Sequence, residues 1–228
     1  MATIGGPNSI VQDGLAFYVD PANKDSYPGS GTDCFNLLNT SETGSMVSSA
    51  MFGNVNAGTF IFDGVDDQLF FDNFNLGTSN TINLWVKSSD SSAAYFGPIG
   101  NDFNQYDYVL FRYQNGSLYY GAGDDTGNGG SVQIAAGSTD EWVDGKWNLH
   151  SFVRDTTNVK YYVNGQIKNN VTKANNFNNK ATCVEWFGRT QGSTWLEGNI
   201  TAISLYKDKA LSAEEVLQNY NSLKARFI

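Results

Sequence analysis

The stretch LEGNITAISLYKDKALSAEEVLQNYNSLKARF, residues 196–227, changes from the pattern of a strand to the pattern of a helix. Residues 200–206 alternate two sets of largely apolar side chains, which is typical of a strand covered on both faces. The polar loop at residues 207–211 then ends the strand. The stretch therefore predicts a buried strand followed directly by a helix.

The helix carries its own start signal. Ser212 is placed to cap the first turn, and Glu215, three residues on, is placed to bond back to the amide of Ser212. Val216 has the position of a hydrophobic staple against the residue before the cap. Because Val216, Tyr220 and Leu223 share one face, we predict an amphipathic helix that docks on a sheet.

The composition predicts many short strands joined by tight turns. The 228 residues include 15 Phe, 12 Tyr, 5 Trp and 24 Gly, and aromatic residues favour strands while glycine favours turns. Runs with strand character number roughly a dozen. We therefore predict a single all-β domain over residues 14–228, a two-sheet antiparallel sandwich with a short C-terminal α-helix, after a flexible segment of residues 1–13.

Turn signals predict hairpins at three places. Residues 63–67, DGVDD, lie between two aromatic-rich runs at 59–62 and 68–72, which indicates a hairpin. Two Asn-Gly pairs supply the positive backbone dihedrals of a tight turn. They join residues 108–113 to 117–121, and residues 159–163 to 166–168.

Two further stretches have less regular patterns. Residues 82–87 alternate apolar side chains with Asn83, Trp85 and Lys87, which predicts a half-buried strand. Residues 40–58 are mostly small and polar, so we expect irregular structure there with one short strand.

The charge excludes two classes of partner. The formal net charge is −9, and no basic cluster interrupts it, so nucleic acid and anionic lipid surfaces are disfavoured. The first residues lack the pattern of a secretory signal, and no apolar run is long enough to insert into a membrane. We expect synthesis in a cytoplasm, with Cys34 and Cys183 as free, buried thiols.

A set of stretches spread along the chain occurs together in one family. They are residues 14–20, 25–31, 60–67, 81–87, 147–153, 161–165 and 196–227. With them the chain resembles the laminin-G-like jelly-roll modules of the concanavalin A-like lectin/glucanase superfamily. The resemblance implies two antiparallel sheets packed face to face. It does not imply one function, because this fold hosts lectins, glycosidases, adhesion modules and structural domains.

Two of these stretches are similar to modules of tailed-phage virion proteins. They are SYPGSG at residues 26–31, and the ending with ALS at 210–212 and QNYN at 218–221. From this resemblance we expect a virion structural or surface protein, on the capsid or a tail fibre, that attaches to other virion proteins and adheres weakly to a host-surface glycan. Such a module often repeats by symmetry as a homo-oligomer. The alternative is a free-standing carbohydrate-binding module or lectin, and a third candidate is an adhesion domain of a cellular protein.

Catalytic chemistry is not indicated. A retaining glycosidase needs two carboxylates about 5 Å apart, but the acidic run at residues 140–144 has the composition of a solvated loop and Glu185 stands alone. His150 lies on a predicted strand without a second histidine, which favours a structural role. We therefore expect no enzyme activity and no catalytic residues.

One turn concentrates potential ligands of calcium. Asp63, Asp66 and Asp67 offer the hard oxygen atoms that Ca²⁺ prefers. The alternative is that their carboxylates accept hydrogen bonds from turn amides, and we favour it. We expect no other cofactor.

The resemblance also bears on calcium through two departures from the family pattern. The region in which such modules have a Trp and an Asp reads CFNLLN here, at residues 34–39. An acidic residue in the lead-in to the last strand is replaced by Asn199 or Thr201. Both departures remove ligands that the family resemblance would otherwise imply.

A sugar site is expected in the loops. An exposed ring for a sugar face, with amide and charged groups that form hydrogen bonds, is the usual chemistry of such sites. The candidate residues are Tyr106, Asp107, Asn128, Arg189, Gln191 and Trp195.

Overall fold

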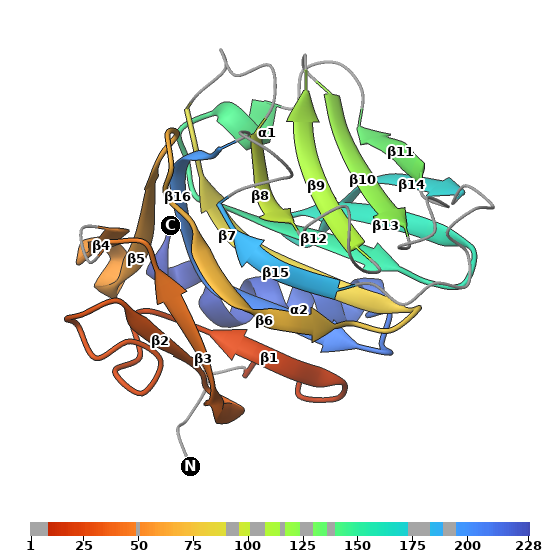
Figure 1. Ribbon diagram of the computed structural model, residues 1–228. Helices are drawn as coiled ribbons and strands as arrows, with labels where there is room; N and C mark the ends of the chain where they lie inside the picture. The colour runs from red at the N-terminus through yellow and green to blue at the C-terminus, as the bar shows by residue number, and fades with distance from the viewer. Residues whose placement is uncertain are drawn as a thin grey trace.

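The computed structural model describes residues 9–48, 51–89, 96–100, 108–114, 117–123, 130–135, 140–172, 183–188 and 195–228. These residues form two β-sheets that lie one behind the other, with a helix behind them (Figure 1). The architecture confirms the predicted all-β sandwich with a short C-terminal helix.

Sheet A contains eight strands. They are β1 (Leu15–Val19), β4 (Phe52–Gly53), β5 (Thr59–Asp63), β7 (Asn80–Lys87), β12 (Asn148–Arg154), β13 (Asn158–Val163), β14 (Gln166–Thr172) and β16 (Glu197–Lys207). Seven follow the order β14-β13-β12-β7-β16-β5-β4. Because β16 is eleven residues long, its first half pairs with β5 and its second half with β1.

Sheet B also contains eight strands. They are β2 (Asp33–Asn36), β3 (Asn39–Met46), β6 (Leu69–Asn75), β8 (Phe96–Gly100), β9 (Tyr108–Gln114), β10 (Ser117–Gly123), β11 (Gly130–Ala135) and β15 (Cys183–Phe187). Their order is β11-β10-β9-β8-β15-β6-β3-β2. The pairings are antiparallel except for one parallel bridge between Cys183 and Tyr108.

Four short helical segments complete the described structure. They are α1 (Asp140–Val143), α2 (Ala213–Leu223) and the 3₁₀ turns η2 (Val55–Ala57) and η4 (Lys224–Arg226). No helix in the described ranges is long and apolar enough to cross a bilayer.

Aromatic side chains fill the space between the sheets. Phe17 of sheet A meets Phe71 of sheet B edge-on, with ring centroids 4.8 Å apart, and it stacks on Phe187 at 6.0 Å. Offset and edge-on ring pairs of this kind add to the free energy gained by burial alone. The predicted aromatic-rich strands thus supply one continuous core.

The outward face of sheet A is also apolar and covered. Trp85 of β7 is fully buried there, stacked on Phe227 at 4.2 Å and on Tyr220 at 5.8 Å. The prediction of a half-buried strand at residues 82–87 is therefore wrong, because a segment distant in sequence covers the indole. The other members of this outer cluster are Trp147, Leu149, Ala202 and Leu223.

Helix α2 begins as the sequence predicts. The amide of Glu215 donates to Ser212 Oγ at 3.2 Å, and the amide of Ser212 donates to Glu215 Oε2 at 2.7 Å. Leu211 and Val216 are buried in the same cluster, as expected for the hydrophobic staple. The prediction that β16 is covered on both faces is likewise confirmed.

Arg226 pins the end of the chain to sheet A. Its Nη1 donates to both carboxylate oxygens of Asp20, at 2.7 and 2.8 Å. Its other nitrogens donate to the carbonyl oxygens of Asn56 and Gly58 and to Thr201 Oγ1, at 2.6, 2.6 and 3.0 Å. Because every nitrogen of the guanidinium has a partner, this partly buried ion pair is fully hydrogen-bonded, and we call it the C-terminal clasp.

The residues before Gly14 meet the same helix. The amide of Val11 donates to Asn219 Oδ1 at 2.8 Å, and its carbonyl accepts from Tyr206 at 3.0 Å. Lys209 forms an ion pair with Asp13. Residues 9–13, which we assigned to a flexible segment, thus contact α2 and the loop before it, while residues 1–8 lie outside the described ranges.

One predicted hairpin is wrong. The run at residues 59–62 belongs to β5 of sheet A, whereas the run at 68–72 belongs to β6 of sheet B. The turn between them reverses the chain but carries it from one sheet to the other. Phe62 and Phe71 consequently face the same core from opposite sides.

The two Asn-Gly hairpins are confirmed. β9 pairs with β10, and β13 pairs with β14. At the second turn Asn164 has φ 52° and Gly165 has φ 79°, the left-handed values that this type of turn requires.

Two segments expected to be irregular are ordered. Residues 39–46 form the eight-residue strand β3, whose polar composition reflects its largely exposed surface. The acidic run at 140–144 contains the helical turn α1, with Trp142 buried against His150 at 4.1 Å.

Cys34 is a free, buried thiol, as expected, and burial raises its pKa to about 12.

The C-terminal clasp predicts the effect of Arg226→Ala. The substitution removes the cation that pairs with the buried Asp20 carboxylate and takes one donor from each of the carbonyl oxygens of Asn56 and Gly58, so we expect the free energy of unfolding to fall by about 3 kcal/mol. Urea unfolding measures it. Lys224→Ala, which alters an exposed lysine two positions away, is the matched control and should cost under about 1 kcal/mol. Equal, small losses would contradict a structural role for the clasp.

Candidate functional site

One end of sheet A gathers polar residues from five neighbouring strands. Because the strands are antiparallel, the last residues of β13, β7 and β5 lie beside the first residues of β12 and β16. Asn164, Asn148, Lys87, Glu197 and Asp63 therefore stand in a row along this edge. We call it the polar end of sheet A, and two candidate sites lie on it.

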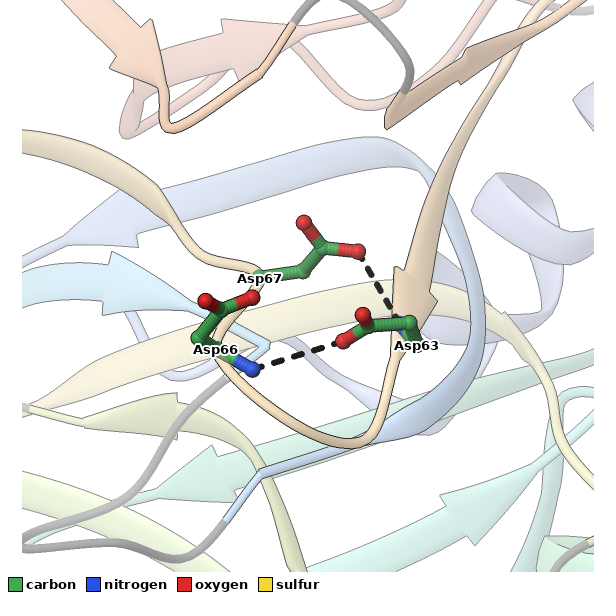
Figure 2. Close-up of side chains that lie close together, drawn as sticks. All are labelled: Asp63, Asp66 and Asp67. Carbon is green, nitrogen blue, oxygen red and sulfur yellow. Dashed lines mark hydrogen bonds between the residues drawn. The ribbon is translucent and has the colours of Figure 1, made fainter.

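The first candidate is the aspartate turn, Asp63, Asp66 and Asp67 (Figure 2). One carboxylate oxygen from each residue lies within 4.8 Å of the others. Asp63 Oδ1 accepts from the amides of Val65 and Asp66 at 2.8 and 3.3 Å, and Asp67 Oδ2 accepts from the amide of Asp63 at 3.0 Å. The carboxylates thus fix the shape of the turn, as the alternative to a metal site requires.

The pKa values of Asp63 and Asp67 are shifted in opposite directions. Hydrogen bonds from turn amides, that of Val65 above all, lower the pKa of Asp63, whereas partial burial and the neighbouring Asp63 charge raise the pKa of Asp67. Asp63 stabilises the fold above its unfolded pKa, and this contribution is lost as the pH falls through the folded value. Asp67 has the opposite sign, because its protonation on acidification relieves repulsion.

The arrangement supplies only part of a calcium site. Ca²⁺ takes six to eight oxygen ligands, and one oxygen of Asp63 and one of Asp67 are already engaged by amides. Calcium binding at this turn therefore stays a prediction that competes with the turn's own hydrogen bonds.

The second candidate is a pocket of about 510 Å³ on the other flank of the polar end. Residues 144–148, Lys87, Asn164, Phe227 and Ile228 line it. We call it the lysine pocket, since Lys87 and Lys146 both contribute to its surface. A volume of this size suits a small organic ligand.

The floor of the lysine pocket is a fixed amide network. Asn148 Nδ2 donates to the carbonyl of Glu141 at 2.7 Å and to Asp144 Oδ1 at 3.2 Å. Asn148 Oδ1 accepts from Asn164 Nδ2 at 2.7 Å, and Asn164 Oδ1 accepts from the amide of Leu149 at 2.9 Å. Asn164 thereby keeps one amide hydrogen and one oxygen lone pair beyond these bonds. The floor is preorganised and still has hydrogen-bonding capacity.

The wall of the pocket is aromatic. The Trp147 and Phe227 rings lie 5.2 Å apart, and Trp147 Nε1 donates to Asn56 Oδ1 at 3.0 Å. Phe227 is held in turn by its stacking on Trp85. The wall therefore offers apolar contacts without needing to move.

Most sequence-predicted sugar residues fall outside the described structure. Trp195 is half-buried directly before β16, two positions from Glu197 at the polar end, and it does not line the lysine pocket. The other five lie outside the described ranges: Tyr106, Asp107, Asn128, Arg189 and Gln191.

The lysine pocket was missed by the sequence analysis. Its residues come from four separate segments that only the fold brings together. Signals were nevertheless present, because each of the four segments has a residue in the family-like stretches: Lys87, Trp147, Asn164 and Phe227.

Two further features of the described ranges are a second pocket and a buried histidine. A smaller pocket of about 370 Å³ lies beside β2, lined by Asp25, Phe35, Leu37 and Thr40. His150 is fully buried, its Nδ1 lies 2.8 Å from the Tyr161 hydroxyl, and burial lowers its pKa to about 3. A neutral, enclosed imidazole is a structural group.

The family follows from the sequence match. Residues 63–217 match a laminin-G family model described as the concanavalin A-like lectin/glucanases superfamily. The chain therefore belongs to this superfamily. A comparison with curated proteins gives no match.

Solved structures similar to this chain include binding domains of clostridial toxins. The binding domain of Paraclostridial Mosquitocidal Protein 1 aligns at 12% identity with a TM-score of 0.67, covering 91% of this chain and 52% of that one. The receptor-binding domain of botulinum neurotoxin C/D mosaic serotype aligns at 16% identity and 0.68, covering 92% and 52%. The botulinum neurotoxin serotype D ligand-binding domain, in complex with N-acetylneuraminic acid, aligns at 14% and 0.65, covering 92% and 51%.

These likenesses establish the fold. The chain spans about half the length of the structures it matches. What those proteins bind is therefore a property of longer chains.

The two readings of the aspartate turn predict different variant behaviour. Asp63→Asn keeps an acceptor for the amides of Val65 and Asp66, so the turn role predicts nearly unchanged stability, whereas Asp63→Ala should cost about 1 kcal/mol. Thermal unfolding with calcium or with EDTA measures both variants and the unchanged protein. A melting temperature that rises with calcium in the unchanged protein but not in Asp63→Asn would instead identify a metal site.

Proposed function

We propose that this chain is a non-enzymatic binding module that recognises a glycan. The lysine pocket carries the proposal, because its size, its fixed amides and its aromatic wall meet at one place. Two comparisons support it: the chain belongs to a superfamily that includes lectins, and the similar solved structures include binding domains. The carbohydrate-binding alternative thus becomes the leading function.

The chemistry of the pocket suits a sugar ring. A pyranose presents hydroxyl groups that both donate and accept hydrogen bonds, and Asn164 offers one of each capacity. Its C–H faces are apolar, and Trp147 and Phe227 provide a matching wall. Because the floor and wall are held by other contacts, binding costs little ordering of the protein.

A binding role without catalysis fits the described acidic groups. Glu141 forms an ion pair with Lys168, and Asp144 accepts from the amide of Lys146 at 2.8 Å and from Asn148. These acids are engaged in structure, whereas a retaining glycosidase needs two carboxylates facing each other across a cleft. We therefore propose ligand retention rather than bond cleavage.

A glycan array followed by NMR tests the proposal. We expect binding to at least one glycan with a dissociation constant of about 1 mM or tighter. Addition of that glycan should shift the backbone amide resonances of residues 145–148 and Asn164, while residues near Trp195 and Tyr106 report on the loop site inferred from the sequence. Absence of binding across the array, or release of reducing sugar from a polysaccharide panel, would overturn the proposal.

A role in a tailed-phage virion is the second candidate. The observation that favours it is the sequence resemblance at residues 26–31 and 218–221. In the structure several of these residues serve the fold: Ser26 Oγ donates to the carbonyl of Phe35 at 2.9 Å, and Asn219 binds Val11 and Tyr206. The likeness therefore supports shared architecture, and attachment to other virion proteins would use other surfaces.

The virion role has a direct test. We expect the chain in purified phage particles at a copy number that matches the symmetry of the capsid or the tail fibre. Quantitative mass spectrometry of the particles measures it. A chain found only in the host cytoplasm would contradict this candidate and leave glycan binding intact.

A further inference from the structure

The pocket of about 370 Å³ beside β2 combines an aromatic ring, an aliphatic side chain and a carboxylate. Phe35 and Leu37 are half-buried there, whereas Asp25 and Thr40 are exposed. We call it the β2 pocket. Among the described residues that line it, Asp25 carries the one charge. Such a surface suits a ligand that has both an apolar part and a positive charge.

The loop before β2 holds Asp25 beside the ring. The amide of Asp25 donates to Asn23 Oδ1 at 2.9 Å, and the amide of Ser26 donates to the carbonyl of Asn23 at 2.9 Å. The amide of Phe35 donates to the carbonyl of Ser26 at 2.8 Å, and Ser26 Oγ donates to the carbonyl of Phe35 at 2.9 Å. Because these bonds tie the loop to β2, binding at the pocket costs little ordering of the backbone.

The residues around the β2 pocket are acidic. The loop, β2 and β3, residues 21–46, contain three carboxylates and one ammonium group, which leave a formal charge of −2: Asp25, Asp33, Glu42 and Lys24. No residue in the described ranges forms an ion pair with Asp25, and Lys24 next to it is exposed to water. The local sign therefore agrees with the formal net charge of −9 for the whole chain, and both favour a cationic partner.

An arginine side chain matches the three features of the pocket together. Its guanidinium is planar and always charged, so it stacks on an aromatic face and forms paired hydrogen bonds with a carboxylate. Its methylene stem packs along aliphatic surface. A lysine ammonium is more strongly hydrated and has no planar face to stack. A neutral sugar would contact the ring but leave the negative charge without a counterion.

We propose that the β2 pocket is an interaction surface that receives an arginine side chain of a partner protein. The guanidinium lies over the Phe35 ring and meets the Asp25 carboxylate, while the stem lies along Leu37. Leu38, which is 41% exposed, offers further apolar surface to the residues that flank the arginine. The β2 pocket shares no residue with the lysine pocket, so the proposal does not depend on glycan binding.

Two peptides that differ by one charge test the proposal. Acetyl-Leu-Arg-Leu-amide carries the guanidinium, and acetyl-Leu-citrulline-Leu-amide replaces it with a neutral urea group of nearly the same shape. We expect the arginine peptide to bind about tenfold more tightly at about 50 mM salt, where surface charges are weakly screened. It should shift the NMR resonances of Asp25, Phe35, Leu37 and Thr40, and the preference should decline as salt is added.

Matched variants locate the effect. Asp25→Asn keeps the size of the side chain and removes its charge, so it should abolish the preference for the arginine peptide. Asp208→Asn removes the same charge from an exposed position after β16 and should keep the preference. Phe35→Leu removes the ring and should weaken binding of the arginine peptide about threefold. Unchanged thermal unfolding of the two aspartate variants checks that they are folded, as expected for exposed positions.

Each contrary outcome has a clear meaning. Equal binding of the two peptides, a preference that Asp25→Asn retains, or no shift of the four pocket residues at about 10 mM arginine peptide would overturn the proposal. A glycan that shifts these residues while the arginine peptide does not would also overturn it and make the β2 pocket a sugar site. None of these results changes what is expected of the lysine pocket.

Discussion

Burial of the outward face of sheet A is the constraint on which the structure depends. A sheet in a two-layer sandwich normally buries one face, but here Trp85, Trp147 and Leu149 make the second face apolar as well. Water contact with these side chains would cost roughly 1.5–3 kcal/mol for each large residue. Helix α2 and the residues after it remove that cost. Their amphipathic stripe, their capping box and the clasp between Arg226 and Asp20 all serve this one packing event.

The same packing creates the candidate binding site. Phe227 lies on Trp85 and thereby stands beside Trp147, so the end of the chain forms one wall of the lysine pocket. Its floor is made by the turn after β13 and the loop before β12, at the end of the sheet where Asn164 and Asn148 meet. The residues that form the candidate site therefore also stabilise the fold, and no further element is needed to hold the site together.

Local structure was predictable from the sequence, whereas contacts between distant segments were not. The capping box at Ser212 and the turn at Asn164 depend on neighbours in sequence, so their patterns identified them. The turn at Asp63 was recognised as a turn, but its composition does not specify whether the next strand joins the same sheet or the opposite one. Trp85 looked half-exposed because its cover lies over 130 positions later in the chain. The lysine pocket was not predicted for the same reason, since Lys87 and Phe227 come together only in the folded chain.

The contacts of residues 11–20 with residues 219–226 have a consequence for how the protein is made. The hydrogen bond from Val11 to Asn219 spans 208 positions, and the bond from Arg226 to Asp20 spans 206. Contacts of such separation form late and slow the folding of all-β domains. A ribosome must therefore release nearly the whole of residues 9–226 before the sandwich closes. Until then the outer face of β7 stays open to chaperones and to other nascent chains.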